Sequence, residues 1–185
     1  MSRYPTTKFC NGALLEAFEP TTRETDVFCS TTAKCGQTWL LQLVHHLRCR
    51  GEDPNPEHRS LLDVVPWLEH PLDIGNGRAP YVVPERLASL TALESPRLFK
   101  MHVVYEELPR PPGSRAPILT VTRDPRDVPY SMFRHLRGMD EGVVGKTVDD
   151  DFDKYFNVWM KLGFYFKFVR SFWPHRDDGD LLWLR

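Results

Sequence analysis

Residues 26–50 read DVFCSTTAKCGQTWLLQLVHHLRCR, and this stretch carries the pattern that defines the fold. Its first part, Asp26–Thr32, is rich in residues that favour extended structure and predicts a β-strand. Trp39, Leu43 and Leu47 recur every four residues, with Leu40 and Val44 alongside, and predict a helix over about 38–50 with one broad apolar face. A strand, a tight loop and a helix in this order form the basic unit of α/β proteins.

The remaining chain continues this alternation of strands and helices. Further strands are predicted at Arg97–Val103, Pro117–Thr122 and Asp180–Arg185. Helices are predicted at Ser60–Glu69, Pro84–Leu93, Asp127–Arg137 and Phe152–Trp173, the last with a break near Gly163. Strands that alternate with helices predict a parallel β-sheet flanked by helices on both faces, an α/β fold. We expect a lead-in over residues 1–25 and one domain over 26–185 that is incomplete at the C-terminus.

Composition and charge narrow the class of protein. The 185 residues carry a formal net charge of −1, so no overall field favours nucleic acid or an anionic membrane. The sequence shows neither a membrane-spanning apolar run nor the pattern of a secretory signal. Its cysteines show no C-x-x-C pair and no metal-like spacing with histidine. We therefore expect a cytoplasmic protein with no metal site and no nucleic-acid or membrane partner.

The loop that joins the first strand to its helix has the chemistry of an anion site. A helix start presents free backbone N–H groups, and Gly36 permits close approach of an oxyanion to them. Lys34 adds a positive charge and Thr38 a hydroxyl donor. A solvated lysine beside an ordinary helix start explains the same residues equally well. The G-x-x-x-x-G-K-[ST] pattern of nucleotide kinases is absent, which argues against that class.

The string T-T-A-K-C-G-Q-T-W at 31–39 resembles the T-Y-P-K-S-G-T-T-W loop of cytosolic sulfotransferases. It departs from that loop by carrying alanine, cysteine and glutamine in place of proline, serine and threonine. The resemblance implies a P-loop-NTPase-like sulfotransferase fold, in which this loop wraps the 5′-phosphosulfate of 3′-phosphoadenosine 5′-phosphosulfate (PAPS). The cofactor-binding residues that it implies here are Lys34, Cys35, Gly36, Gln37, Thr38 and Trp39.

A second segment, R-D-P-R-D at 123–127 followed by Ser131, resembles the R-[ND]-P-x-D-x-x-x-S element of the same family. The resemblance implies that Arg123 and Ser131 bind the 3′-phosphate, for which arginine offers a two-pronged fork of donors. The alternative is that Arg123 pairs with Asp127 across a tight turn and that Ser131 is an ordinary residue of a helix face.

The third match is Lys100-Met101-His102, which resembles the family's K-T-H. Strand alternation places Lys100 and His102 on the same side. Histidine titrates near neutrality and can take a proton from an attacking hydroxyl, although a histidine on a strand is more often structural. The resemblance implies that His102 is the catalytic base. It also implies that Lys34 stabilises the leaving oxygen and Lys100 the group in transfer.

The implied function is transfer of a sulfuryl group from PAPS, without a metal, to a hydroxyl or amine of a small-molecule acceptor such as a phenol, steroid or alcohol. A homodimer is a possible assembly. The alternative is a truncated, non-catalytic member of the fold that binds a nucleotide or a partner. Candidate walls of an acceptor pocket are Trp67, Tyr81, Tyr105 and Phe133. The aromatic residues between 152 and 173 are expected to pack in the core.

Overall fold

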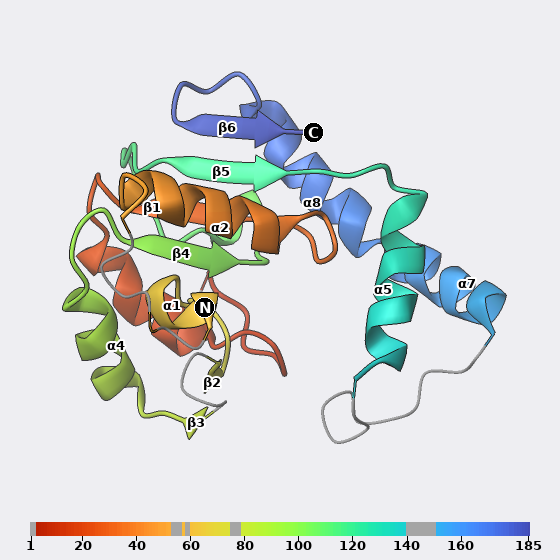
Figure 1. Cartoon of the computed structure of the whole chain (residues 1–185), viewed down its shortest axis with the longest axis horizontal. Coiled ribbons are helices and arrows are strands. Elements are labelled where there is room, and N and C mark those ends of the chain that lie inside the picture. Colours follow the sequence, from red (N-terminus) through yellow and green to blue (C-terminus); the bar gives the residue numbers. More distant parts are fainter. Residues whose placement is uncertain (1–2, 53–56, 58–59, 75–78, 140–150) are drawn as a thin grey trace.

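The computed structural model describes residues 3–52, 57, 60–74, 79–139 and 151–185 (Figure 1). Within these ranges, four parallel strands form one sheet in the order β4-β1-β5-β6. The strands are β1 (Val27–Ser30), β4 (Leu98–Met101), β5 (Ile118–Val121) and β6 (Leu181–Leu184). A separate antiparallel pair consists of β2 (Leu72–Asp73) and β3 (Ala79–Pro80). The prediction of a parallel sheet within an α/β fold is confirmed.

The helices cover both faces of this sheet and extend beyond it. Their bounds are α1 (Gly12–Phe18), α2 (Gln37–Arg48), α3 (Leu61–Val64), α4 (Val83–Thr91), α5 (Asp127–Arg137), α7 (Phe152–Leu162) and α8 (Phe164–Phe172). Three short 3-10 turns lie at Glu19–Thr21, Tyr105–Glu107 and Trp173–His175. The predicted break of the last long helix occurs at Gly163, whose φ of 61° ends α7 and starts α8 in a new direction. None of the helices in the described ranges has the length and apolarity needed to cross a bilayer.

The helix predicted at Ser60–Glu69 is much shorter in the structure. Its helical part, α3, has four residues and ends before Val65. Val65 precedes a proline and leaves the helical conformation, with φ of −130° and ψ of 78°, since the α region is disfavoured before proline. The prediction was wrong for 66–69: this segment runs beside β4, with the Leu68 N–H donating to the Lys100 carbonyl over 3.0 Å.

Helix α2 buries only part of the broad apolar face predicted for it. Trp39 and Leu47, expected on the buried face, are 66% and 67% exposed, whereas Leu40 is 1% exposed. The helix carries two apolar stripes, and only one of them can face the sheet. The side chain of Gln37 selects that stripe, because its amide donates to the Cys29 carbonyl over 2.9 Å and to the Met101 carbonyl over 2.7 Å.

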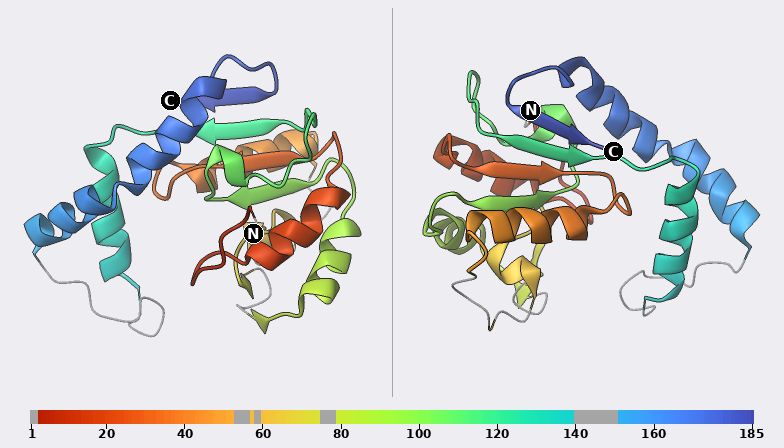
Figure 2. Two further views of the ribbon diagram at one scale, coloured as in Figure 1. Left: turned by 180° about the vertical axis from the view of Figure 1, so that it is seen from behind. Right: turned by 45° about the horizontal axis from the view of Figure 1, so that its top comes forward.

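Figure 2 shows helices on both faces of the sheet, and alternate residues of the strands build one core on each face. Phe28 and Phe99 pack with α1, α4 and α8 on one face. Cys29 and Leu98 pack with α2 and α3 on the other. The N-terminal segment contributes helix α1 to the first core, in which Leu14 is completely buried.

Helices α5 and α7 pack against each other and project from the edge at which the strands end (Figure 1). Phe133 of α5 meets Phe152 and Tyr155 of α7 at ring distances of 5.4 Å. The expected core packing of the later aromatic residues is only partly found: Phe168 is buried, but Phe164 and Trp173 are exposed.

Candidate active site

The loop between β1 and α2 has the backbone geometry of an anion cradle. Lys34 and Gly36 adopt left-handed conformations with φ of 68° and 90°, which turn the chain sharply into the helix. No side chain caps the start of α2. The first free N–H groups of the helix, from Gln37 to Trp39, therefore point toward the loop and can hold an oxyanion.

Two predicted site residues of this loop face inward. The Gln37 side chain is buried against β1 and β4, so only its backbone N–H is left for a ligand. Cys35 is buried as well, and its Sγ lies 2.9 Å from the Thr32 hydroxyl. Burial raises the pKa of the Cys35 thiol, which is therefore a neutral neighbour of the cradle. Thr38 and Trp39 are exposed.

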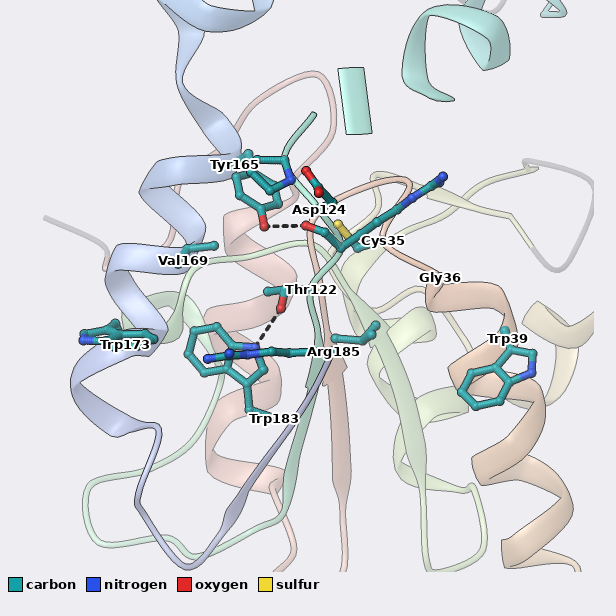
Figure 3. Close-up of a pocket in the computed structure, with 13 residues that line it drawn as sticks. Cys35, Gly36, Trp39, Thr122, Asp124, Tyr165, Val169, Trp173, Trp183 and Arg185 are labelled. Atoms are coloured by element: carbon teal, nitrogen blue, oxygen red, sulfur yellow. Dashed lines mark hydrogen bonds between the residues drawn. The ribbon is translucent and has the colours of Figure 1, made fainter. Parts of the chain in front are cut away.

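A hollow of about 810 Å³ opens beside this loop, between α2 and α8 (Figure 3). Its lining includes Gly36 and Trp39 from the loop and helix, Arg123 after β5, and Trp173 and Trp183 from the last two elements. In Figure 3 Trp39 lies across the hollow from Trp173. The hollow thus combines backbone donors, a guanidinium and exposed aromatic rings, which suits a nucleotide phosphate and base.

The chain after β5 is held in place by side chains from α8 and β6. The Trp183 indole N–H donates to the Thr122 hydroxyl over 2.9 Å, and the Tyr165 hydroxyl donates to the Arg123 carbonyl over 2.7 Å (Figure 3). These bonds fix the backbone from which the Arg123 side chain extends.

The Arg123 guanidinium contacts Asp127 at 3.4 Å, as in the alternative interpretation of this segment. Both side chains are well exposed, so solvent screens the pair and an anion can compete for the guanidinium. Ser131 is partly buried on α5. No hydrogen bond joins it to Lys34 or Arg123 within the described residues.

His102 lies directly after β4 and beside the end of β1. The Ser30–Met101 register of these strands brings the carbonyl of Thr31 to 2.6 Å from His102 Nδ1. A carbonyl only accepts, so Nδ1 carries the hydrogen and Nε2 keeps its lone pair. Burial and the charge of Lys100 lower the pKa of His102 to about 4. His102 is therefore neutral and able to accept a proton throughout the physiological range.

Lys100 lies on the same side of β4, as alternation predicts. Its ammonium sits 3.7 Å from the ring centre of Trp67, and His102 meets the same ring edge-on at 5.0 Å. Burial lowers the pKa of Lys100 to about 8, although the charge of Glu69 opposes this effect. A cation held over an indole near a neutral histidine suits a reaction that develops negative charge.

The charges of Lys34 in the loop and of Lys100 on β4 both affect His135 on α5. Burial, then the charges of Lys34 and Lys100, lower the pKa of His135 on α5. His135 follows Ser131 by one helical turn, so the two residues lie on the same face of α5. Across the described ranges, no cluster of histidine, cysteine and carboxylate side chains is arranged to hold a metal ion.

The candidate acceptor residues separate into two groups. Trp67 contacts His102, and the His70 ring packs on Trp67 in a tilted arrangement while the His70 carbonyl accepts from Tyr81. Tyr105 instead packs on Phe172 and His175, and Phe133 packs on α7. Only Trp67 and Tyr81 therefore belong to the surroundings of the histidine.

Three features of the site were missed from sequence. Glu69 contacts His102 and Trp67, the pKa of His135 is lowered by burial and by the charges of both lysines, and Tyr165 holds the Arg123 backbone. Only Glu69 left a usable signal: the proline at 66 ends helical structure, and alternation from Trp67 then places Glu69 on the same side.

Known proteins resemble the chain in both sequence and structure. The family model for the sulfotransferase domain matches residues 24–185. Human sulfotransferase 4A1 is 30% identical over 182 residues, covering 96% of this chain and 58% of that protein. The luciferin sulfotransferase of Photinus pyralis is 30% identical over 173 residues, covering 86% of this chain and 45% of the relative.

A solved structure, mouse sulfotransferase SULT7A1 complexed with PAP, superposes with a TM-score of 0.66 at 19% identity. It covers 96% of this chain, and the chain covers 58% of that protein. The chain thus has the architecture of these enzymes and spans about half of their length, between 45% and 58%.

Proposed function

Because the chain belongs to the sulfotransferase family, we propose that it binds PAPS at the carboxyl edge of its sheet and transfers the sulfuryl group to a small acceptor. The observation that carries this proposal is the arrangement around His102. A neutral imidazole with a fixed tautomer lies between the end of the phosphate-type loop and a lysine held over an indole. Abstraction of a proton beside a developing negative charge requires a base and a cation placed in this way.

The nucleotide fits the residues that are present. The uncapped start of α2 and the left-handed turn at Gly36 suit the 5′-phosphate. The exposed ring of Trp39 suits the adenine, and the Arg123 guanidinium suits the 3′-phosphate. The inward Gln37 side chain does not obstruct the cradle, because it is bonded to the sheet.

PAPS supplies the sulfuryl group when it is bound. In the proposed reaction, His102 Nε2 takes the proton of the acceptor as the acceptor oxygen or nitrogen attacks sulfur. Lys34 stabilises the charge that develops on the oxygen between sulfate and phosphate. Lys100 stabilises the group in transfer, and the loop N–H groups hold the phosphate in line.

The surroundings of His102 favour an acceptor with an aromatic or alicyclic body. Trp67 meets the His102 ring edge-on, and Tyr81 donates to the carbonyl of His70, which packs on Trp67. A phenol, a steroid or another small alcohol would place its hydroxyl at the histidine and its body on the indole. A relative named for luciferin supports a small-molecule acceptor.

The four free cysteines support a cytoplasmic setting.

A second candidate function is nucleotide binding without turnover. It is favoured by the altered loop, in which Cys35 and Gln37 turn inward and leave fewer side-chain donors for the phosphosulfate.

Transfer of a labelled sulfuryl group from PAPS to a panel of phenols, steroids and amines tests the proposal. We expect transfer by the natural chain and its loss by about 10²–10⁴-fold in His102→Gln, because the general base is removed. His46→Gln, on the exposed side of α2, is the matched control and should retain the rate. PAP is the nucleotide that remains when PAPS has given up its sulfuryl group. Binding of PAP without any transfer would contradict the transferase proposal and favour the second candidate.

A further inference from the structure

The segment 66–69 forms a short extension of the sheet beside β4. The Lys100 N–H donates to the Pro66 carbonyl over 3.0 Å, and the Leu68 N–H donates to the Lys100 carbonyl over the same distance. Trp67 thereby pairs with Lys100 in a parallel bridge. Since side chains alternate along extended backbone, Trp67 and Glu69 face the side that carries Lys100 and His102.

The Glu69 carboxylate is fixed at the centre of this group. Its Oε1 accepts from the His102 backbone N–H over 2.7 Å and from the Trp67 indole N–H over 2.6 Å. The backbone carbonyl of Glu69 accepts from the Asn11 N–H over 2.7 Å. The carboxylate thus ties together the main chain of the proposed base and the ring on which Lys100 rests.

A carboxylate in this position is costly unless a positive charge balances it. Glu69 is 2% exposed, and its Oε2 has no hydrogen-bond partner among the described residues. Burial raises the pKa of Glu69 to about 7, while its two hydrogen bonds and the charge of Lys100 oppose the rise. In return, the charge of Glu69 raises the pKa of Lys100, which burial alone would lower further.

The other titratable groups around this pair are few. His102 and His70 lie at the end of β4 and at the adjoining position of the segment, and Cys10 lies in the N-terminal segment. His135 of α5 is also within reach of the Lys100 charge, which together with burial lowers its pKa. Burial raises the pKa of Cys10 to about 12, so Cys10 is neutral. Lys100 is therefore the charge that balances Glu69.

We propose that Glu69 is a positioning residue of the transfer site, which fixes the His102 main chain and keeps Lys100 positively charged. This inference rests on the proposed function, since it names a further residue for that reaction. The proposed role of Glu69 differs from a purely structural role in one respect: it requires electrostatic coupling between Glu69 and Lys100. A carboxylate that only held the backbone would be replaced without consequence by an amide of the same shape.

The test is the titration of Lys100, followed by NMR of ¹³C-labelled lysine, in the whole chain without any ligand. Glu69→Gln keeps an oxygen that can accept from His102 and Trp67 but removes the charge. We expect the Lys100 midpoint to fall from near 8 by at least about one unit in this variant. Glu107→Gln is the control, because Glu107 is also a partly buried carboxyl with a raised pKa but contacts neither Lys100 nor His102. An unchanged Lys100 midpoint in Glu69→Gln would overturn the proposal.

A reciprocal measurement keeps the proposal testable if Glu69→Gln does not fold. The carboxyl of Glu69 should titrate near 7 in the natural chain, and Lys100→Met should move that midpoint upward. A Glu69 midpoint that is ordinary, or unmoved by Lys100→Met, would contradict the coupling.

Nucleotide binding separates this inference from the function on which it rests. Glu69 lies outside the loop and the hollow, so Glu69→Gln should leave PAP affinity unchanged while the alkaline limit of the transfer rate moves to lower pH. A natural chain that binds no PAP would contradict the proposed function. A chain that transfers normally and whose alkaline limit is the same in Glu69→Gln would contradict only the role of Glu69.

Discussion

Lys34 and Gly36 are two residues apart, and both have left-handed backbone conformations. Such conformations cost a residue with a Cβ about 1 kcal/mol or more, and they persist where the surrounding structure needs them. Here they turn the chain so that the start of α2 faces the loop without a side-chain cap. The sequence predicts a turn at Gly36, but it does not predict the left-handed conformation of Lys34.

Gly36→Ala tests whether this turn matters. A Cβ at Gly36 meets no atom within 4 Å, so the substitution adds backbone strain at φ 90° without a steric clash. We expect a loss of about 1 kcal/mol in unfolding free energy and weaker PAP binding, because the loop N–H groups lose their alignment. Denaturant unfolding and calorimetry measure the two effects.

Gly179→Ala is the matched control for that substitution. Its added Cβ also meets open space, but its φ lies outside the left-handed region. It should leave stability and PAP binding nearly unchanged. Equal effects of the two alanines would show that the left-handed turn has no special role.

Side-chain direction separates what the sequence predicted at the site from what it did not. Lys100 and His102 share a side, as strand alternation requires. Gln37 turned inward because it bonds to carbonyls of two strands that are far apart in sequence. No local pattern contains that information. Glu69 was missed because 60–69 has a helical pattern that the proline cuts short.

At the scale of elements, the order of the four strands of the main sheet and of the helices between them followed from the sequence, whereas the roll of α2, helix α1 and the β2–β3 pair did not. Two apolar stripes compete for the sheet, and periodicity alone gives them equal weight. The stripe with Leu40 is buried, and the stripe with Trp39 and Leu47 is exposed. The roll also leaves the Trp39 ring free to line the hollow.

Alanine substitutions on α2 test this roll. Leu40→Ala should lower the unfolding free energy by about 2–5 kcal/mol, because it opens a cavity in a closed core. Leu47→Ala should change it by no more than about 0.5 kcal/mol, since that side chain is 67% exposed. Urea unfolding of both variants gives the comparison. A larger cost for Leu47→Ala would reverse the assignment of the faces.

At the scale of the whole molecule, the sheet brings three distant segments to one edge. Parallel pairing of β1 with β4 and β5 places the loop after β1, His102 and Arg123 at the carboxyl ends of adjacent strands. The order of the motifs and the parallel sheet were predictable, since strands alternate with helices. The packing of α1 into the core was not, because the sequence before residue 26 shows no long periodic pattern.

The buried histidine links this architecture to the pH dependence of stability. The pKa of His102 is about 4 in the folded chain and 6.5 ordinarily, so the unfolded chain gains a proton first as pH falls. Stability from this group is complete above about 6.5 and is lost toward 4. Between pH 7 and 5, the natural chain should lose about 1–2 kcal/mol more than His102→Gln does.

Denaturant unfolding at the two pH values checks this expectation, with His46→Gln as the control on the exposed side of α2. The control should keep the loss of the natural chain. The same pH dependence in His102→Gln would mean that the imidazole protonates as readily in the folded chain as in the unfolded one.

The central claim is that the edge formed by the loop and Arg123 binds the nucleotide of a sulfotransferase. Calorimetric titration of the chain with PAP tests it most directly, with Arg123→Ala compared against Arg126→Ala. Arg126 is the matched control, because its side chain is 87% exposed, pairs with Asp124 and does not line the hollow.

We predict measurable binding that Arg123→Ala weakens by about 10–100-fold, as the loss of a charged hydrogen bond to phosphate implies. Lys34→Ala should weaken binding similarly, and Arg126→Ala by no more than about twofold. Absence of PAP binding, or equal effects of the substitutions at Arg123 and Arg126, would contradict the account.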